Sequence, residues 1–199
     1  MEYYDAIKMR RSRYDLTNQS SISDEKLQEI LSEVITYTPS AFNSQTSRVL
    51  LLLNEEHLKL WDIVRKTLQK IVPVDKFGPT EAKIHSFEKA HGTILFYEDT
   101  DTVEKLQKDF ASYADNFPIW SQQSSGMLQF AVWTALAQEG LGASLQHYNP
   151  IIDEEVKAVF NVKGNWKLIA QMPFGKANSE PDAIEHMLIE NRLFVKGKK

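Results

Sequence analysis

A cluster of positive charge lies near the N-terminus of an otherwise acidic chain. Lys8, Arg10, Arg11 and Arg13 fall within six residues, and Ser12 adds a hydroxyl group. This set suits a phosphate monoester, because guanidinium groups donate paired hydrogen bonds to its oxygens and the hydroxyl is a neutral donor. The alternative interpretation is a solvated basic turn after a short helix, since charge runs are usually solvated.

A second polar feature is the loop at residues 39–45, which connects an expected helix to an expected strand. The amide side chains of Asn43 and Gln45 each offer a donor and an acceptor in one plane. Such groups match the alternating donors and acceptors at the pyrimidine edge of a flavin. The alternative is an ordinary helix-to-strand turn, in which Ser and Asn are common.

Two glycines, Gly140 and Gly142, precede a polar segment that ends at Pro150. Their spacing resembles the start of the dinucleotide-binding fingerprint, but the third glycine is missing and the segment follows a helix rather than a strand. A Rossmann site is therefore excluded. The alternative interpretation is a helix C-cap followed by a tight turn.

Motifs of several other enzyme classes are absent from the sequence. It contains no Walker-type phosphate loop, no H-E-x-x-H and no G-x-S-x-G. With no cysteine, and with five histidines that lack ligand spacing, we expect no metal site, and each histidine is interpreted as a surface or core residue. No nucleophile and base can be assembled for a hydrolase. A flavin enzyme escapes this requirement, because its cofactor carries the hydride chemistry.

Length and composition favour one soluble domain, residues 1–199, or one subunit of an intertwined dimer. The net charge of −4 and the pI of about 5.8 argue against binding of nucleic acid by the whole protein. The N-terminus lacks an apolar signal core, and no apolar run is long enough to span a membrane. Together with the absence of cysteine, this leads us to expect a cytoplasmic protein.

The hydrophobic spacing predicts an α+β fold with a small sheet and long helices packed on it. Continuous apolar runs at residues 49–53 and 93–97 predict strands that are covered on both faces. Further strands are expected at 166–174 and, as a short strand or strand edge, at 145–148. Helices are expected at residues 2–9, from an N-cap at Ser23 to Pro39, and at 55–70, 80–90, 100–114 and 153–160.

The segment 124–139 differs from the other expected helices because apolar residues surround almost its whole circumference. Nine apolar residues surround it: Met127, Leu128, Phe130, Ala131, Val132, Trp133, Ala135, Leu136 and Ala137. A helix that is apolar all round is a core helix or a subunit interface.

Together these segments resemble the nitroreductase family. The resemblance lies in Arg10-Arg11-Ser12, in the P-S-x-x-N-x-Q motif of residues 39–45, and in the glycine-bounded turn that ends in Gln146-His147-Tyr148-Asn149-Pro150. Each motif alone is weak, but their order and spacing are specific and extend over nearly the whole chain. Three stretches resemble a short branch of bacterial proteins and fungal fatty-acid-repression-type proteins: residues 117–121, 126–129 and 145–150.

The resemblance implies a nitroreductase-like fold in which helices flank a central mixed or antiparallel sheet. It also implies an intertwined homodimer with one FMN per active site at the subunit interface. Proteins of this family reduce nitroaromatics, quinones or related acceptors with electrons from NADH or NADPH, by ping-pong hydride transfer. The other possibilities are a flavin-binding sensor or carrier with little turnover, a flavin enzyme of another reaction type, and a nucleic-acid-binding module built on the basic segment.

The resemblance also implies roles for residues at the phosphate end of the cofactor. Arg10, Arg11 and Ser12 would hold the phosphate and the ribityl chain, and the later basic candidates are Lys176 and Arg192. One departure is Tyr14, which stands where many family members carry Lys or Arg.

At the ring end, Ser40, Asn43 and Gln45 would meet the ribityl chain or the ring edge from the partner subunit. The Gln146-His147 turn would place a backbone N–H near flavin N5, where the hydride arrives. No catalytic acid or base is identified.

For the substrate pocket, the resemblance implies that Trp120 would cover the open face of the ring and that Tyr148 would also line the pocket. The chain is short for the family, which leads us to expect a smaller lid and a more open substrate site.

Overall fold

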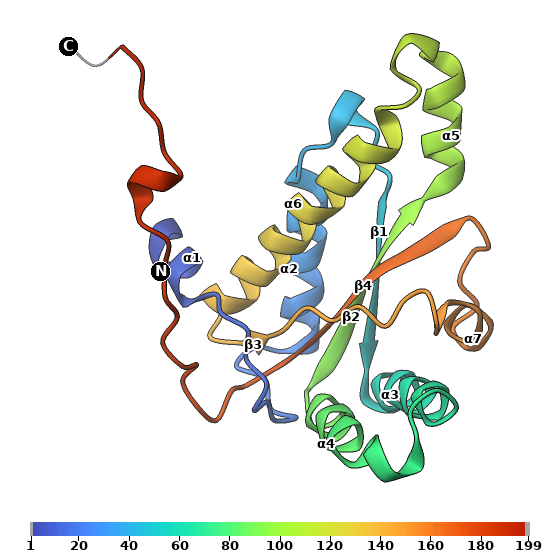
Figure 1. Ribbon diagram of the computed structural model, residues 1–199, viewed down its shortest axis with the longest axis vertical. Helices are drawn as coiled ribbons and strands as arrows, with labels where there is room; N and C mark the ends of the chain where they lie inside the picture. Colours follow the sequence, from blue (N-terminus) through green and yellow to red (C-terminus); the bar gives the residue numbers. More distant parts are fainter. Residues whose placement is uncertain (1, 198–199) are drawn as a thin grey trace.

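A four-stranded antiparallel sheet with the strand order β1-β2-β4-β3 forms the centre of the computed structural model, which describes residues 2–197 (Figure 1). The fold is α+β with an antiparallel sheet flanked by helices, as the sequence predicted. In chain order the elements are α1 (Tyr3–Met9), α2 (Asp24–Tyr37), β1 (Ser47–Leu53), α3 (Asn54–Gln69), α4 (Phe77–Glu88), β2 (Gly92–Asp99), α5 (Thr100–Asp109), α6 (Phe117–Gln138), β3 (Gly142–Ala143), α7 (Asp153–Val159) and β4 (Trp166–Gly175).

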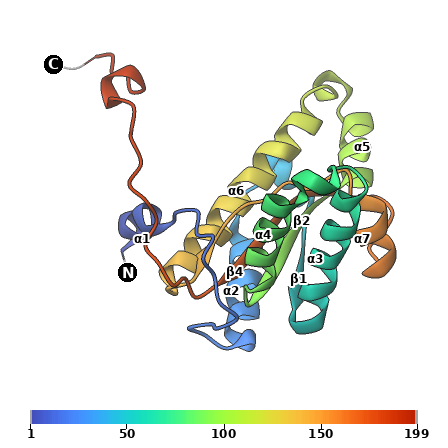
Figure 2. The ribbon, with the colours of Figure 1, turned by 60° about the horizontal axis from the view of Figure 1, so that its bottom comes forward.

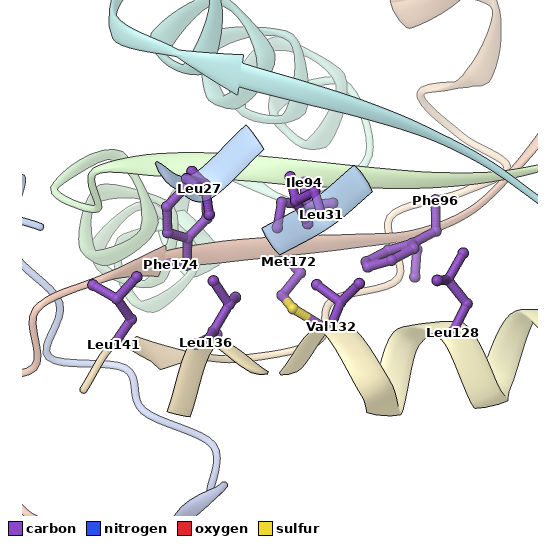
Figure 3. Close-up of a cluster of buried hydrophobic side chains, with 12 residues drawn as sticks. Leu27, Leu31, Ile94, Phe96, Leu128, Val132, Leu136, Leu141, Met172 and Phe174 are labelled. Carbon is purple, nitrogen blue, oxygen red and sulfur yellow. The ribbon is translucent and has the colours of Figure 1, made fainter. Parts of the chain in front are cut away.

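Helices cover both faces of the sheet, and β2 is the strand buried between the two layers. Ile94 and Phe96 point into a core with α2 and α6, whereas Leu95 and Tyr97 point into a core with α3 and α4. Figure 3 shows the first core, in which Leu128, Val132 and Leu136 of α6 face the sheet. All eight residues of β2 are buried, which confirms the prediction of a strand covered on both faces.

The same prediction is confirmed only in part for β1, because both of its faces pack against a core but the burial is incomplete. Only Leu52 of its seven residues is buried, and the others are intermediate. The reason is the position of β1 at the end of the sheet, where it pairs with β2 alone. Val49 and Leu51 pack against the core with α2 and α6, and Leu50 and Leu52 against the core with α3 and α4, so each face of the strand is partly covered.

Helix α6 begins seven residues earlier than expected, at Phe117 rather than Ser124, with Pro118 in its first turn. A proline there suits a helix start, because the first turn needs no N–H donor. One side of α6 is core, but Met127 and Phe130 are 43% and 40% exposed. The helix is therefore apolar all round, as expected, and only part of that surface is covered within one chain.

Several local predictions are confirmed and one is corrected. Ser23 caps α2 by accepting a hydrogen bond from the Lys26 N–H at 3.2 Å. Gly140 ends α6 with a φ of 77°, as a helix C-cap requires. The strand expected at 145–148 lies earlier in the chain, where it is β3 (Gly142–Ala143). Within 145–148 only Gln146 pairs with the sheet, in an isolated bridge to Gln171.

The chain after β4 leaves the sheet beside the N-terminal segment, runs past α1 and then extends away from the sheet and the other helices, as both views show (Figures 1 and 2). A side chain at Gly175 would place its Cβ 2.2 Å from the carbonyl oxygen of Thr17, so the crossing requires glycine. The two segments are joined there by backbone hydrogen bonds from Thr17 N to Lys176 O at 2.9 Å and from Lys176 N to Gln19 O at 2.8 Å. Within residues 2–197 no helix has the length and apolar character needed to cross a membrane.

Candidate functional site

The basic segment and the C-terminal tail meet around a cavity of about 220 Å³. Arg13 forms an ion pair with Glu180 at 2.8 Å and also donates to the carbonyl oxygen of Ser179 at 2.8 Å. Arg11 donates to the carbonyl oxygen of Asp182 at 2.7 Å. Three oxygen atoms, one of them from a carboxylate, therefore occupy guanidinium donors of this segment. A phosphate would offer the same kind of acceptor.

Arg10 is placed differently from its two neighbours. Its guanidinium lies 4.5 Å from the ring centroid of Trp133, which is a cation–π distance. Burial, together with the charge of Arg11, lowers the pKa of Arg10 below its usual value. Its buried Nε has no hydrogen-bond partner among the described residues. A positive charge with an unused donor at the wall of the cavity fits an anionic ligand.

The other residues predicted at the phosphate end are only partly brought together. Ser12 is exposed beside β3 and forms an isolated parallel β-bridge with Ala143 of that strand. Lys176 is exposed at the first position of the tail, next to this segment. Arg192 lies far along the tail, after the 3-10 turn Ile189–Asn191, and its side chain forms no ion pair with the described residues. One chain therefore leaves Arg192 apart from the basic segment.

The loop at residues 39–45 has an unusual backbone. Phe42, Asn43 and Gln45 have φ angles of 56°, 50° and 48°, in the left-handed region that side chains other than glycine seldom adopt. Ser40 stabilises this shape, because its hydroxyl oxygen accepts from Gln45 N at 2.9 Å and its carbonyl oxygen accepts from Asn43 N at 3.0 Å. Backbone strain of this kind is concentrated at ligand-binding sites.

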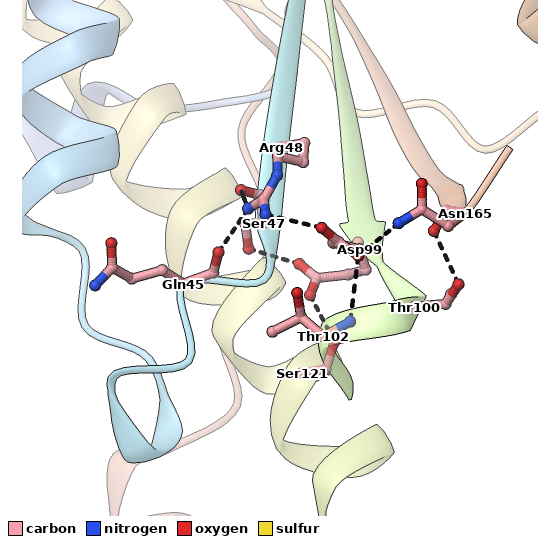
Figure 4. A network of polar contacts seen from close by, with 9 residues as sticks. Gln45, Ser47, Arg48, Asp99, Thr100, Thr102, Ser121 and Asn165 are labelled. Atoms are coloured by element: carbon pink, nitrogen blue, oxygen red, sulfur yellow. Dashed lines mark hydrogen bonds and ion pairs between the residues drawn. The ribbon is translucent and has the colours of Figure 1, made fainter. Parts of the chain in front are cut away.

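Arg48 connects this loop to the end of the sheet (Figure 4). Its guanidinium donates to the carbonyl oxygen of Gln45 at 2.6 Å and to Asp99 at 2.9 Å. Asp99 also accepts from Asn165 Nδ2 at 2.8 Å and from Thr102 N at 3.3 Å. The sequence analysis did not identify Arg48 or Asp99. In the sequence, Arg48 is marked only as a lone arginine directly before the apolar run 49–53.

Glu98 is a second buried carboxylate in the same region. Its side chain accepts from Ser47 Oγ and from Ser121 Oγ, each at 2.5 Å, and it is only 2% exposed. These two bonds tie β1 and α6 to β2. Both partners are neutral hydroxyls, so hydrogen bonds rather than an ion pair satisfy this carboxylate.

A cavity of about 340 Å³ lies between the end of α2, β1 and α6. Ser40 and Gln45 line it, and its other polar lining residues are Thr36, Thr38, Ser47, Arg48 and Ser124. Asn43 is exposed and is not part of the lining. Two of the three residues predicted in this loop are thus brought to one cavity.

An aromatic cluster adjoins the loop. The Trp120 ring stacks on Phe42 with a centroid distance of 5.8 Å and an interplanar angle of 20°. Phe42 also contacts Phe110 at 5.1 Å and Phe117 at 5.3 Å, and it is 51% exposed. Trp120 is therefore part of a partly exposed aromatic surface at the start of α6.

Tyr148, the other residue predicted to line the substrate pocket, is not part of this aromatic cluster. Its ring packs on Trp61 at 5.9 Å, in the core formed with α3 and α4, and burial raises the pKa of its hydroxyl. The physical reason is the backbone of the turn, where Tyr148 N donates to the side chain of Gln171 at 2.7 Å.

The backbone N–H of Gln146 is already used inside the chain. It donates to the carbonyl oxygen of Gln171 at 2.7 Å, and Gln171 N donates back to Gln146 O at 2.9 Å. His147 is exposed. His57, by contrast, is a core residue whose pKa is lowered by burial. Across the described residues, no three or more His, Cys, Asp or Glu side chains gather as a metal site would require.

Comparison with known proteins identifies the family. Residues 7–176 match a family model described as the nitroreductase family. The putative nitroreductase HBN1 of Saccharomyces cerevisiae is 34% identical over 183 residues, which are 90% of each chain. The chain therefore belongs to the nitroreductase family, a class of oxidoreductases.

Solved structures agree with this assignment. Nitroreductase CinD from Lactococcus lactis, in complex with chloramphenicol, is 41% identical and has a TM-score of 0.90, with 98% of this chain and 100% of that chain covered. The same protein has also been solved with 4-nitrophenol. A putative nitroreductase from Desulfovibrio desulfuricans in complex with FMN has a TM-score of 0.73 over 100% of this chain and 99% of that one, but its 17% identity supports the fold alone.

Proposed function

We propose that this chain is an FMN-dependent NAD(P)H oxidoreductase that reduces nitroaromatic, quinone or related acceptors by ping-pong hydride transfer. The observation that carries the proposal is the cavity at the basic segment, where Arg13 already holds a carboxylate and the buried Nε of Arg10 has no described partner. Family membership supports it, as do the complexes of CinD with 4-nitrophenol and chloramphenicol.

At the phosphate end, we assign Arg10, Arg11 and Ser12 to the phosphate and ribityl chain, with Lys176 alongside. A phosphate that reaches Arg13 must displace the Glu180 carboxylate, which is exposed and easily released. Arg192 lies far along the tail, so any contact it makes with a phosphate would be with the cofactor of a second subunit.

At the ring end, Ser40 and Gln45 would supply hydrogen bonds from the walls of the cavity beside α6, and Asn43 would do so from the exposed tip of the loop. Bound FMN would supply the hydride chemistry that side chains lack. Because the N–H of Gln146 is occupied, the N–H of His147 is the donor of that pair assigned to flavin N5. Trp120, stacked on Phe42, would cover the open face of the ring.

A homodimer and a cytoplasmic location are parts of the same proposal, as is a single domain over residues 1–199, of which 1 and 198–199 lie outside the described residues. The tail supports the dimer, because its large apolar side chains are exposed to solvent in one chain. An apolar surface of that kind is typical of an obligate interface. The exposed fractions are 65% for Met187, 64% for Leu188, 61% for Leu193 and 75% for Phe194.

The first experiment is the visible spectrum of the purified protein, followed by denaturation and identification of the released chromophore. We expect oxidised-flavin absorption and FMN rather than FAD. A protein that stays colourless in excess FMN would contradict the proposal. Stopped-flow mixing with NADH and NADPH then tests turnover, because a yellow protein that neither nucleotide reduces would instead be a flavin carrier or sensor.

A further inference from the structure

We propose that Arg48, oriented by Asp99, is a positioning residue that fixes the left-handed backbone of Gln45 and so prepares the flavin-binding loop before the ligand arrives. The inference rests on the proposed function, because it takes FMN as the ligand of this loop. It concerns two residues outside the motifs that led to that function.

The geometry places Arg48 between the loop and the sheet. Nη1 donates to Gln45 O at 2.6 Å and to Ser47 O at 3.0 Å, while Nη2 meets Asp99 Oδ2 at 2.9 Å. On the other side of the same residue, Gln45 N donates to Ser40 Oγ at 2.9 Å. Both the N–H and the carbonyl group of Gln45 are therefore held by side chains.

This restraint matters because Gln45 has a φ of 48°. A glutamine in the left-handed region is strained, and it stays there only when its surroundings impose that conformation. In Figure 4 the Gln45 side chain extends away from Arg48 and the polar network. Without the bond to its carbonyl, the residue can relax to an ordinary φ and turn its amide to another direction.

Asp99 in turn fixes the direction of Arg48. The Asp99 carboxylate is held by Asn165 and by the N–H of Thr102, and its own N–H donates to Thr46 O at 2.9 Å. The side chains of Arg48 and Asp99 are only 32% and 12% exposed, so the pair is less screened by salt than a surface pair. Its contacts use two nitrogen atoms held apart in one plane, which a guanidinium has and a lysine ammonium, with its single nitrogen, lacks.

The charge balance points to positioning rather than to electrostatic catalysis. Arg48 lines the same cavity as Ser40 and Gln45, but the Asp99 carboxylate at 2.9 Å offsets its charge. What the pair contributes to the cavity is therefore a fixed orientation of the loop.

The test begins with flavin-free protein. Arg48→Lys keeps the charge and most of the side-chain volume but removes the pair of guanidinium nitrogens that bond to Gln45 and Asp99. Arg65→Lys is the matched control, because the Arg65 guanidinium also uses two of its nitrogens, here for the carboxylates of Glu81 and Glu88, away from this loop. We expect faster hydrogen exchange at residues 41–46 in Arg48→Lys and not in the control. Unchanged exchange in that loop would overturn the inference, whether or not the protein binds FMN.

The second readout is FMN affinity, measured by fluorescence quenching in a double-mutant cycle with Gln45→Ala. Arg48→Lys should weaken binding by on the order of tenfold, as expected for a lost hydrogen bond to a charged group. The same substitution should have little further effect once the Gln45 side chain is absent. Independent, additive losses would show that Arg48 does not act through Gln45.

Asp99→Asn is the second variant, for the case in which Arg48→Lys does not fold. It should accelerate exchange in the same loop, and normal exchange there would overturn the inference. If the wild-type protein binds no flavin but the loop loosens in these variants, the proposed function fails and the positioning role stands.

Discussion

The two ends of the candidate site are built in opposite ways. The loop end is held by Arg48 and Asp99, which lie at least half-buried and are bound by contacts from β1, β2 and α5. The phosphate end is held by Arg11 and Arg13, whose partners belong to an extended tail, and the Glu180 side chain is 91% exposed. We infer that the loop is ordered before a ligand arrives, whereas the phosphate end is completed by exchange of partners.

Physical chemistry supports this division. An exposed ion pair contributes about 0.2–1 kcal/mol, because water and salt screen it and two long side chains must be ordered. A phosphate can therefore displace Glu180 from Arg13 with little loss. The buried network offers no comparable exchange, since removal of one partner leaves the other polar groups unsatisfied.

The largest expected effect is at the anchor of the phosphate end. Trp133→Glu would place a carboxylate against the core and remove the ring under Arg10, so we expect aggregated or FMN-free protein. Size-exclusion chromatography and the flavin content measure this. Trp133→Phe, which keeps an aromatic ring, should remain soluble. A soluble, yellow and active Trp133→Glu protein would refute the prediction.

The next largest effect concerns the stability of the loop end. Glu98→Ala leaves the hydroxyls of Ser47 and Ser121 without their acceptor, and we expect a loss of about 2–4 kcal/mol in the free energy of unfolding. Glu98→Gln should recover most of this loss, because its amide can bond to both hydroxyls. Denaturant titration of both variants tests the prediction. Equal stability of Glu98→Ala and wild type would show that this end is not held by its network.

A third prediction separates binding from stability. Arg11→Ala should weaken FMN binding by about tenfold, as a lost charge-assisted bond implies, with little change in unfolding free energy. Lys8→Ala is the matched control, because it removes one positive charge from the same segment but outside the cavity. If both variants lose the same affinity, the segment acts only through its overall charge.

The smallest expected effect is an increase, rather than a decrease, in FMN affinity. Glu180→Gln removes the carboxylate that competes for Arg13, and FMN affinity should rise by up to about fivefold, the equivalent of a surface ion pair. Asp182→Asn controls for the loss of one negative charge, because only the backbone carbonyl of Asp182 contacts Arg11. Weaker FMN binding in Glu180→Gln would mean that Glu180 supports the site rather than competing for it.

The sequence predicted those parts of the fold that local patterns determine. The Ser23 cap of α2 and the two strands β2 and β4 follow from residues within their own segments. The partly covered state of β1 does not, because an apolar run cannot show how many neighbours a strand has. The first turns of α6 were missed because Ser121 and the glutamines after it interrupt the apolar spacing.

The candidate site divides in the same manner. Ser40 and Gln45, which the motifs named, line one cavity, and Arg10 lines another. The Arg48–Asp99 pair joins two strands that lie far apart in the sequence, so no local spacing marks it. For Tyr148, whose ring packs on Trp61, the motif position does not reveal which way the side chain turns.

The crossing at Gly175 has a consequence for mutational tolerance. The tail leaves β4 there against the carbonyl oxygen of Thr17, while nothing lies within 4 Å of an added Cβ at Gly164. In a saturation library, position 175 should accept a single amino acid and position 164 many. The path that brings the tail to the basic segment thus depends on the absence of one methyl group, at a position that takes no part in the chemistry.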